Sequence, residues 1–303
     1  MIAIDFTGSH RKFFEIILSA YGAAGRRWLD DLPQLVDEIA EKWSLTIEKP
    51  FPNLSYNFVV PCIRSDGTQA VLKIAFCFEN SEIFDEYKLL KYLDGRGAVR
   101  VFDLDENRCA MLLERLTPGE NLFQLCANEP ERATEIAVET LKRFQQPAAP
   151  NCNFPLLEKW TNGFARAENT EFPKMIVKKV RGIYEELNGT AAKYLLHGDF
   201  HHENILSATR EPFLLIDPKG IVGGIGYDIA VFLNNLVRWQ LSAPDVDSKI
   251  KNAVEKFGEV FEIEPSKLRK WAYAQMVLSA LWTFEDRTGK WREELDFAEI
   301  WKV

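Results

Sequence analysis

Apolar residues near the start of the chain recur at helical spacing and then give way to short apolar runs bounded by turn residues. One helical face over residues 28–43 would carry Leu32, Leu35, Val36, Ile39 and Trp43, which predicts a helix there. The later runs are separated by turn signals such as Ser65-Asp66-Gly67, a pattern typical of strands. We predict strands over Asn57–Cys62, Thr68–Phe78, Val99–Leu104 and Cys109–Leu116, and a helix over Asn80–Leu93.

Helical spacing dominates after Thr117-Pro118-Gly119. The segment Glu129–Gln146 places Ala133, Ile136, Ala137, Leu141 and Phe144 on one face. Two stretches depart from the helical pattern, Leu195–Leu206 and Phe213–Asp217, and we expect short strands around loops there. The remaining predicted helices lie near 155–168, 173–188, 228–241, 246–257 and 266–284.

These patterns predict an α+β fold with two lobes, a small N-terminal lobe with an antiparallel sheet and a larger, mainly helical C-terminal lobe. We place the first lobe at residues 1–116, with a helical extension over about 1–45, and the second at 117–303. The hinge between them falls near 114–119. A ligand cleft between the lobes is the usual consequence of such a plan.

Net charge and the length of apolar runs limit the classes of binding partner that we expect. The chain has 303 residues, and its net charge of −8 argues against nucleic acid, which requires a basic face. No apolar run reaches the length of a membrane span. The segment Phe13–Gly25 follows the basic pair Arg11-Lys12 but is interrupted by Glu15, so we interpret it as amphipathic and not as a signal peptide. We expect a cytoplasmic protein without a nucleic-acid or membrane partner, and the sequence leaves the oligomeric state open.

Cysteine spacing gives no sign of a metal site or of a disulfide framework. The five cysteines, an odd number, are spread along the chain without a CxxC pair, at Cys62, Cys77, Cys109, Cys126 and Cys152. We expect buried free thiols in a reducing compartment.

Two charged residues of the first lobe lie in apolar surroundings. Lys73 stands in the run Ala70–Phe76, where a buried lysine is costly unless it is paired. Glu86 lies beside the apolar stripe of the next predicted helix. Each has an ordinary alternative, an edge strand with Lys73 facing water and a solvated glutamate. Considered together, they could form an ion pair inside the small lobe.

The stretch LLHGDFHHENIL, residues 195–206, concentrates candidate chemistry. One interpretation is a metal hydrolase in which His197, Asp199, His201 and His202 hold the metal. Metal sites of that kind draw ligands from several elements, and the fourth histidine of the chain, His10, is far upstream. We therefore expect His197 to brace the loop by hydrogen bonds, and leave open whether His201 and His202 line a cleft or are structural.

The other interpretation is phosphoryl transfer. That reaction needs magnesium on oxygen ligands, a cation on the phosphates and a base near the acceptor hydroxyl. Asn204 lies five residues after Asp199, and Asp217 ends the apolar run Phe213–Asp217. In this scheme Asn204 and Asp217 are the magnesium ligands, Asp199 accepts the proton, and Lys73 holds the phosphates with Glu86 orienting it.

The same residues carry a family resemblance. Their order resembles the protein-kinase-like fold, and HGDxHxxN with IDP is similar to the aminoglycoside phosphotransferase branch of that superfamily. The blocks LLHGDFHHENIL, LLIDPKG, YLDGRGAVRVFDLD and MLLERLTPGE resemble the aminoglycoside 6-phosphotransferase and hydroxyurea phosphotransferase family, which includes streptomycin kinases. The resemblance spans about residues 50 to 240 and implies ATP and Mg²⁺ as cofactors, with a nucleotide-binding first lobe and a catalytic, substrate-binding second lobe.

The resemblance also assigns roles to single residues. Asp199 is similar to the catalytic aspartate, Asn204 and Asp217 to the magnesium ligands, and Lys73 with Glu86 to the nucleotide ion pair. Glu114 to Leu116 falls where the hinge backbone binds adenine. Asp228 is similar to an aspartate that braces the catalytic loop, although an ordinary helix N-cap would explain it equally well.

This sequence departs from protein kinases at two places. No glycine occurs between Gly25 and Gly67, so Pro52–Asn57 would have to cover the phosphates with Ser55 and backbone N–H groups. Asp217 is followed by Pro218-Lys219-Gly220 instead of a DFG phenylalanine. For Lys219 we favour exposure to solvent over contact with phosphate or substrate.

The acceptor is a small molecule whose identity the sequence leaves open. The family implies a streptomycin-type aminoglycoside or hydroxyurea. Residues 243–303 hold 12 acidic and 10 basic residues, a balance that does not call for a polycation, although Glu264, Glu285 and Asp286 could cluster. Alternatives are a metabolic amino-sugar or amino-alcohol kinase of the same fold, a catalytically silent nucleotide-binding protein and, more remotely, the metal hydrolase. ATP and GTP are not distinguished.

Overall fold

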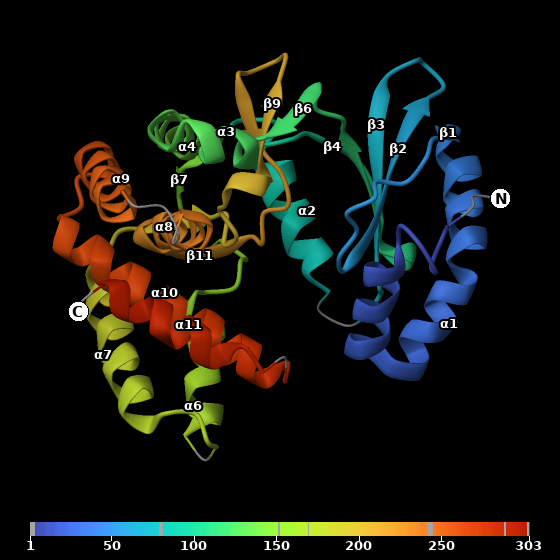
Figure 1. Ribbon diagram of the computed structural model, residues 1–303. Coiled ribbons are helices and arrows are strands. Elements are labelled where there is room, and N and C mark those ends of the chain that lie inside the picture. The colour runs from blue at the N-terminus through green and yellow to red at the C-terminus, as the bar shows by residue number, and fades with distance from the viewer. Residues whose placement is uncertain are drawn as a thin grey trace. The chain divides into compact units, whose positions relative to one another are not determined.

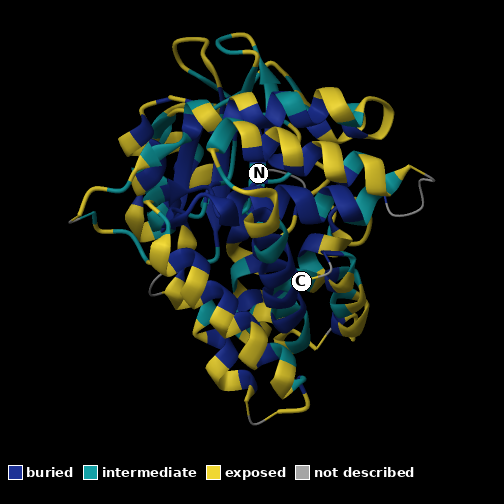
Figure 2. Cartoon of the chain, turned by 90° about the vertical axis from the view of Figure 1, so that its left-hand side faces the viewer, coloured by how far each residue is buried: buried dark blue, intermediate teal, exposed yellow. Residues whose placement is uncertain are grey.

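The computed structural model describes residues 4–78, 81–150, 152–168, 170–240, 245–287, 289–301 and 303 (Figure 1). The chain forms two compact units, Met1–Thr117 and Pro118–Val303. In both, buried residues lie on the inner faces of the helices and exposed residues on the outer faces (Figure 2). No helix among the described residues combines the length and the apolar character that a membrane span requires.

A five-stranded antiparallel sheet forms the centre of the first unit. Its strand order is β1-β2-β3-β5-β4, and every neighbouring pair is antiparallel. The predicted strands are therefore present, with an additional edge strand, β1, that was not predicted. The bounds are β1 Leu45–Ile47, β2 Asn57–Arg64, β3 Gln69–Ala75, β4 Val101–Asp105 and β5 Ala110–Glu114, and a 3₁₀ turn, η1, covers Glu106–Arg108.

One face of this sheet is covered by α1 (Arg11–Trp43), which changes direction at Gly22 (Figure 1). Gly22 has φ 55° and ψ −130°, a conformation that a side chain would disfavour. The helix buries Phe13, Ile17 and Leu29 against sheet residues such as Phe58 and Leu72. Each such side chain contributes roughly 1.5–3 kcal/mol when it leaves water. The N-terminal extension thus forms part of the core of the first unit.

Helix α2 (Glu82–Leu93) follows β3 and buries Ile83, Leu89, Leu90 and Leu93 along one stripe. It ends with Asp94 and Gly95 at φ 48° and 84°, a left-handed termination that is common at helix C-termini and favours glycine. The prediction began this helix at Asn80, which lies outside the described residues.

Helices make up most of the second unit. Two three-stranded sheets, ordered β10-β9-β6 and β11-β8-β7, carry the loops between them. The helices are α3 Leu122–Asn128, α4 Pro130–Phe144, α5 Glu158–Thr161, α6 Gly163–Ala167, α7 Lys174–Thr190, α8 Gly226–Gln240, α9 Val246–Phe261, α10 Pro265–Glu285 and α11 Trp291–Ala298. The strands are β6 Pro118–Asn121, β7 Gln146–Pro147, β8 Lys193–Leu196, β9 Ile205–Ala208, β10 Phe213–Leu215 and β11 Ile221–Gly224; short 3₁₀ turns are η2 His202–Asn204 and η3 Glu299–Trp301.

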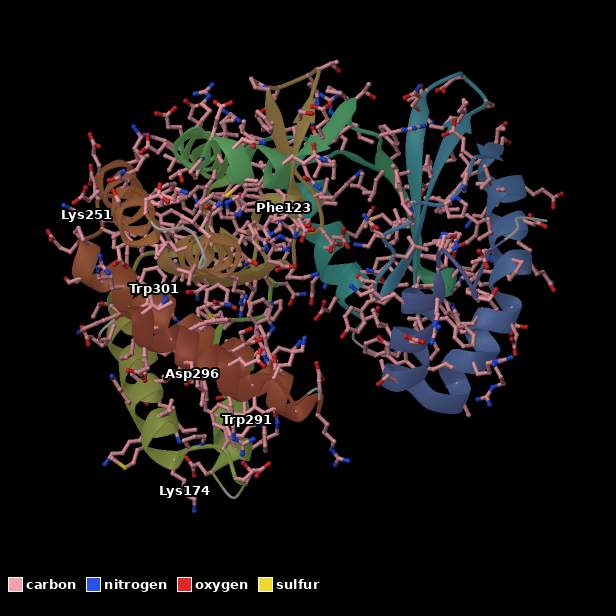
Figure 3. The ribbon with its side chains drawn as sticks, viewed as in Figure 1. Phe123, Lys174, Lys251, Trp291, Asp296 and Trp301 are labelled. Atoms are coloured by element: carbon pink, nitrogen blue, oxygen red, sulfur yellow. A yellow bond between two sulfur atoms is a disulfide. The ribbon has the colours of Figure 1, made fainter. Side chains whose placement is uncertain are left out.

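The core of the second unit is organised around α8 and α10, both of which are buried on most sides. Asn234 of α8 donates to the carbonyl oxygen of Ala272 at 2.9 Å and accepts from the indole N–H of Trp301 at 2.8 Å. Figure 3 labels Trp301, whose ring is fully buried. This polar network fixes α8, the helix on which Asp228 lies.

Helix boundaries differ from the predictions in two places. The helix predicted over 155–168 is divided into α5 and α6, which meet at Asn162. The helix predicted over Glu129–Gln146 begins at Pro130, because proline fits the first turn of a helix, and ends at Phe144. In the helix predicted over 228–241, position 241 lies outside the described residues.

The prediction of free, buried thiols is wrong for two cysteines. Cys77 and Cys109 form a disulfide, and Cys62, Cys126 and Cys152 are free, with Cys152 only half-buried. The two partners are 32 residues apart and meet because β3 and β5 are neighbours; the N–H of Ala75 donates to the carbonyl oxygen of Cys109 at 3.0 Å. Sequence spacing gave no sign of this proximity.

The disulfide makes a testable prediction. Thiol titration of unreduced, denatured protein should find three reactive thiols, and reduction should raise the number to five, since two are bonded. Replacing the exposed Cys77 (Cys77→Ser) should lower the free energy of unfolding by about 2–4 kcal/mol, because the closed loop no longer restricts the unfolded chain. Cys152→Ser is the matched control and should lower both thiol numbers without this loss of stability. Five thiols in unreduced protein would contradict the bond.

Candidate active site

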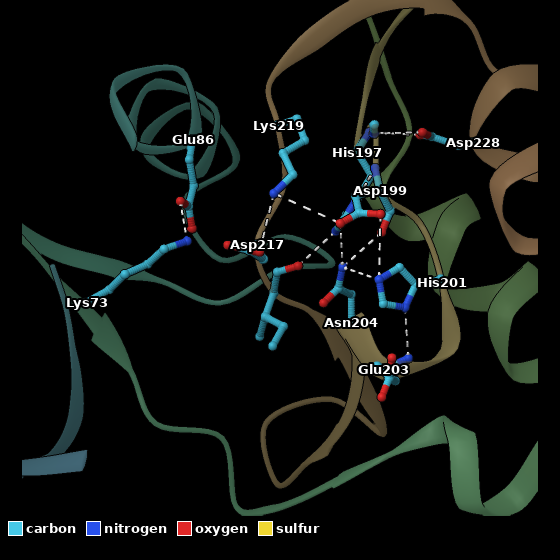
Figure 4. Close-up of polar contacts among 12 residues, drawn as sticks. Lys73, Glu86, His197, Asp199, His201, Glu203, Asn204, Asp217, Lys219 and Asp228 are labelled. Carbon is cyan, nitrogen blue, oxygen red and sulfur yellow. Dashed lines mark hydrogen bonds and ion pairs between the residues drawn. The ribbon is translucent and has the colours of Figure 1, made fainter. Parts of the chain in front are cut away.

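In the first unit, the central strand β3 carries Lys73. The strand has β2 on one side and β5 on the other, so the edge-strand alternative for Lys73 is wrong. Lys73 is 5% exposed, and its Nζ lies 2.6 Å from Oε2 of Glu86, which is also 5% exposed (Figure 4). The predicted ion pair is therefore present.

Strand alternation explains where Lys73 points. Leu72 and Ile74 lie in the core against α1, so the side chain between them leaves the opposite face of the sheet. Glu86 meets it from the buried stripe of α2. Buried ion pairs are poor sources of stability, because desolvating both charges costs several kcal/mol. The effect of this pair is therefore positional: Glu86 holds the ammonium group of Lys73 at a defined place.

The catalytic loop candidate in the second unit is anchored by Asp228. Its carboxylate is fully buried and accepts two backbone N–H groups, from His197 to Oδ2 and from Gly198 to Oδ1, both at 2.8 Å. Burial raises the pKa of Asp228 to about 7, and the two N–H donors oppose that rise. Asp228 lies within α8 and bonds across to the loop, so the N-cap alternative does not describe its role.

Gly198 is required by its surroundings. It has φ 82°, and an added Cβ would stand 2.8 Å from the ring of Trp160 and 3.0 Å from Cβ of Lys219. Both the conformation and the space exclude a side chain. The loop therefore turns tightly between β8 and Asp199.

His197 braces the loop through both ring nitrogens, as predicted. Nε2 lies 2.9 Å from the carbonyl oxygen of Ile216, and Nδ1 accepts the N–H of Asp199 at 3.2 Å. These partners fit the neutral tautomer with its proton on Nε2. Burial lowers the pKa of His197 to about 4, so the ring stays neutral at ordinary pH.

The other two histidines of the loop point elsewhere. His201 accepts the N–H of Glu203 through Nδ1 at 3.3 Å, and its Nε2 lies 3.6 Å from Oδ1 of Asp199. His202 is fully buried and stacks on Phe232, with ring centroids 4.0 Å apart. Since the three rings are engaged in three different places, the geometry does not support the metal hydrolase.

Asp199, Asn204 and Asp217 come together at the end of the β9–β10 hairpin (Figure 4). Nδ2 of Asn204 donates to the backbone oxygen of Asp199 at 2.9 Å, which leaves the amide oxygen as the group available to a cation. The N–H of Ile216 donates to the carbonyl oxygen of Asn204 at 3.0 Å and sets Asp217 beside it. Carboxylate and amide oxygens are the ligands that Mg²⁺ prefers, so the residues present fit that ion.

Asp217 has an unusual backbone conformation, and the neighbouring Asp199 has a lowered pKa. Asp217 has φ 63°, a left-handed conformation that is uncommon outside glycine and often occurs at functional sites. Burial alone would raise the pKa of Asp199, but the hydrogen bond and charge of His201 and the charge of Lys219 lower it to about 2. Asp199 is therefore an anion throughout the working pH range.

The structure corrects our expectation that the side chain of Lys219 is exposed to solvent. Its side chain is 25% exposed, and Nζ lies 3.3 Å from Oδ2 of Asp217 and 4.0 Å from Oδ2 of Asp199. The contact between His201 and Asp199, at 3.6 Å, was likewise not predicted. The sequence could have indicated both contacts, because Lys219 lies two residues after Asp217 and His201 lies two residues after Asp199.

The other nucleotide candidates lie in the first unit. Ser55 is exposed in the connection between β1 and β2. Glu114 ends β5, where its N–H donates to the carbonyl oxygen of Arg100 at 2.9 Å and its Oε2 accepts the N–H of Arg100 at 3.0 Å. Leu116 follows half-buried. Their nucleotide roles remain predictions.

Comparison with known proteins agrees with this geometry. Residues 42–287 match the family described as aminoglycoside/hydroxyurea antibiotic resistance kinase. The chain is 29% identical to a streptomycin 6-kinase of Streptomyces glaucescens, with 88% of each chain covered. It is 30% identical to a hydroxyurea phosphotransferase of Kitasatospora aureofaciens, covering 91% of this chain and 80% of the relative.

Solved structures confirm the fold prediction. An aminoglycoside phosphotransferase in a ternary complex with ADP and hygromycin B superposes with a TM-score of 0.56 at 12% identity, covering 87% of this chain and 97% of that one. At this identity the likeness establishes the two-lobed, protein-kinase-like fold alone. The match over residues 42–287, together with the 30% identity across most of the chain, shows that this protein belongs to the aminoglycoside/hydroxyurea antibiotic resistance kinase family.

Proposed function

We propose that this phosphotransferase is an ATP-dependent kinase that transfers the γ-phosphate to a hydroxyl group of a small molecule, a streptomycin-type aminoglycoside or hydroxyurea. The observation that carries the proposal is the convergence of Asp199, Asn204 and Asp217 on a loop anchored by Asp228. One carboxylate is available to the acceptor, and the other two groups offer oxygen ligands.

The proposed chemistry divides among these residues. Asn204 and Asp217 would hold Mg²⁺, which supplies charge stabilisation for the phosphates. Asp199 orients the acceptor hydroxyl by accepting its hydrogen bond. A carboxylate with a pKa of about 2 is a weak base, so Asp199 takes the proton only as the new P–O bond forms and the hydroxyl becomes acidic.

The proposed nucleotide groups come from residues 1–116, the N-terminal nucleotide-binding lobe. Lys73 would bind the α- and β-phosphates while Glu86 keeps its ammonium in place. The backbone at Glu114 and Leu116 would bind adenine. Ser55, with neighbouring N–H groups, would cover the phosphates in place of a glycine-rich loop. Residues 117–303 would then form the catalytic and substrate-binding lobe.

The support for an aminoglycoside or hydroxyurea acceptor comes from the relatives, because the three acidic residues considered from the sequence do not form one cluster. Glu264 and Asp286 flank opposite ends of α10, a helix of 21 residues and therefore roughly 30 Å long. Glu285 forms a salt bridge with Arg166 at 2.8 Å. A metabolic amino-sugar or amino-alcohol remains the second candidate. We propose a cytoplasmic location, where ATP is available.

The role of Asp199 can be tested with an acceptor panel. The wild-type protein, Mg²⁺ and ATP should phosphorylate an aminoglycoside or hydroxyurea in a phosphate-transfer assay, and Asp199→Asn should lower kcat by about 10²–10⁴-fold because the proton acceptor is lost. ATP affinity, measured by calorimetry, should stay near the wild-type value.

Asp247→Asn, which removes an exposed carboxylate in α9, is the charge-matched control and should be fully active. Full activity of Asp199→Asn would overturn the mechanism. Wild-type protein that binds Mg²⁺ and ATP but phosphorylates nothing in the panel, amino-sugars and amino-alcohols included, would support the silent nucleotide-binding alternative.

The Lys73–Glu86 pair offers a second test, which separates stability from function. Lys73→Met should destabilise the protein by about 3–5 kcal/mol in urea unfolding, because one partner of a buried ion pair is removed while the carboxylate of Glu86 stays buried. The double variant Lys73→Met/Glu86→Leu should recover most of that stability but should not recover ATP binding. If the stable double variant binds ATP as tightly as the wild type, the pair has no nucleotide role.

A further inference from the structure

Lys219 occupies a defined position between two carboxylates of the candidate active site. Its Nζ lies 3.3 Å from Oδ2 of Asp217 and 4.0 Å from Oδ2 of Asp199 (Figure 4). Its side chain, at 25% exposed, is less accessible than those of Asp217 and Asp199, at 32% and 38%. The ammonium group thus lies beside the two carboxylates that the reaction is proposed to use, and it is closer to Asp217.

The fold holds Lys219 there from two sides. The left-handed backbone at Asp217 and at Gly220, with φ 63° and 62°, turns the segment back toward the loop. The N–H of Lys219 donates to the carbonyl oxygen of His197 at 2.7 Å. Its Cβ and Cγ pass along Gly198, where a side chain would collide with them. A lysine at an ordinary surface position has none of these constraints.

The charges around this ammonium explain what it does. Asp217 and Asp199 are like charges that both approach it, and His197 is neutral. A cation between two carboxylates offsets their repulsion. Under the proposed function, Oδ2 of Asp217 is also an oxygen that Mg²⁺ would use. The lysine and the divalent ion therefore compete for one carboxylate.

We propose that Lys219 is a positioning residue, a built-in counter-cation that holds Asp217 and Asp199 in the ligand-free enzyme and that a divalent ion must displace from Asp217. This inference rests on the proposed function for the identity of the metal ligands. It implies that the ion binds weakly while the nucleotide is absent and binds well only when phosphate oxygens complete its coordination. Ion and nucleotide binding are thereby coupled.

The experiment measures Mn²⁺ binding to the nucleotide-free protein by electron paramagnetic resonance of the free ion. Lys219→Met removes the charge and keeps the length, so it should bind Mn²⁺ about two- to fivefold more tightly than the wild type, as expected for loss of a competing, partly exposed ion pair. Lys219→Arg keeps the charge and should bind like the wild type. Lys219→Met/Asp217→Asn should lose the gain, because the contested carboxylate is gone.

A matched control tests whether the loss of any one positive charge changes Mn²⁺ affinity. Lys251→Met replaces an exposed lysine of α9, labelled in Figure 3, and should leave Mn²⁺ affinity unchanged. Equal or weaker Mn²⁺ binding by Lys219→Met would overturn the inference, as would an equal gain in Lys251→Met. Should Lys219→Met not fold, Lys219→Gln makes the same comparison.

The binding measurement needs neither ATP nor acceptor, so its result can contradict the role of Lys219 without contradicting the proposed function. Phosphate transfer by the wild type without a gain in Lys219→Met defeats only the counter-cation role. A gain in Lys219→Met with no transfer by the wild type to any acceptor defeats the kinase proposal.

Discussion

The paired hydrogen bonds from His197 and Gly198 to the buried carboxylate of Asp228 are the interaction on which the candidate site depends. A carboxylate in the interior is unfavourable unless donors surround it, and here two backbone N–H groups face it. The bonds fix the backbone at the end of β8, where the chain leaves the sheet. Asp199 and Asn204 follow on the same loop, and Asp217 is tied to it by the hydrogen bond between His197 and the carbonyl oxygen of Ile216.

Hydrogen bonds connect the anchored backbone to the rest of the candidate site. His197 joins the start of the loop to Ile216, and Asn204 joins the loop back to Asp199. Since Ile216 precedes Asp217, the anchor that positions Asp199, the proposed proton acceptor, also positions Asp217, the proposed second oxygen ligand. The first unit also holds a buried charge by pairing, because the ammonium group of Lys73 lies 2.6 Å from the carboxylate of Glu86. In both units a charge is costly to bury, and its partner decides where it lies.

The sequence predicted those parts of the site that follow from local periodicity. The cost of burying an unpaired Lys73 in an apolar run and the place of Glu86 beside an apolar stripe predicted their pairing, and the spacing of Asp199, Asn204 and Asp217 suggested the proposed oxygen ligands. The sequence could not predict features that arise from backbone conformation or from strand order. The orientation of Lys219 depends on left-handed residues on both sides of it, and the Cys77–Cys109 bond depends on β3 lying beside β5.

Under the proposed function, the loop serves a cation that oxygen atoms hold, and its histidines shape the loop without binding the ion. The most direct measurement is a crystal structure with Mn²⁺ and a non-hydrolysable ATP analogue, in which anomalous scattering locates the ion. We predict the ion in direct contact with the amide oxygen of Asn204 and the carboxylate of Asp217, with phosphate oxygens beside it and His197 still bonded to Ile216. An ion bound by His197, His201 or His202, or one away from Asp217, would contradict the account.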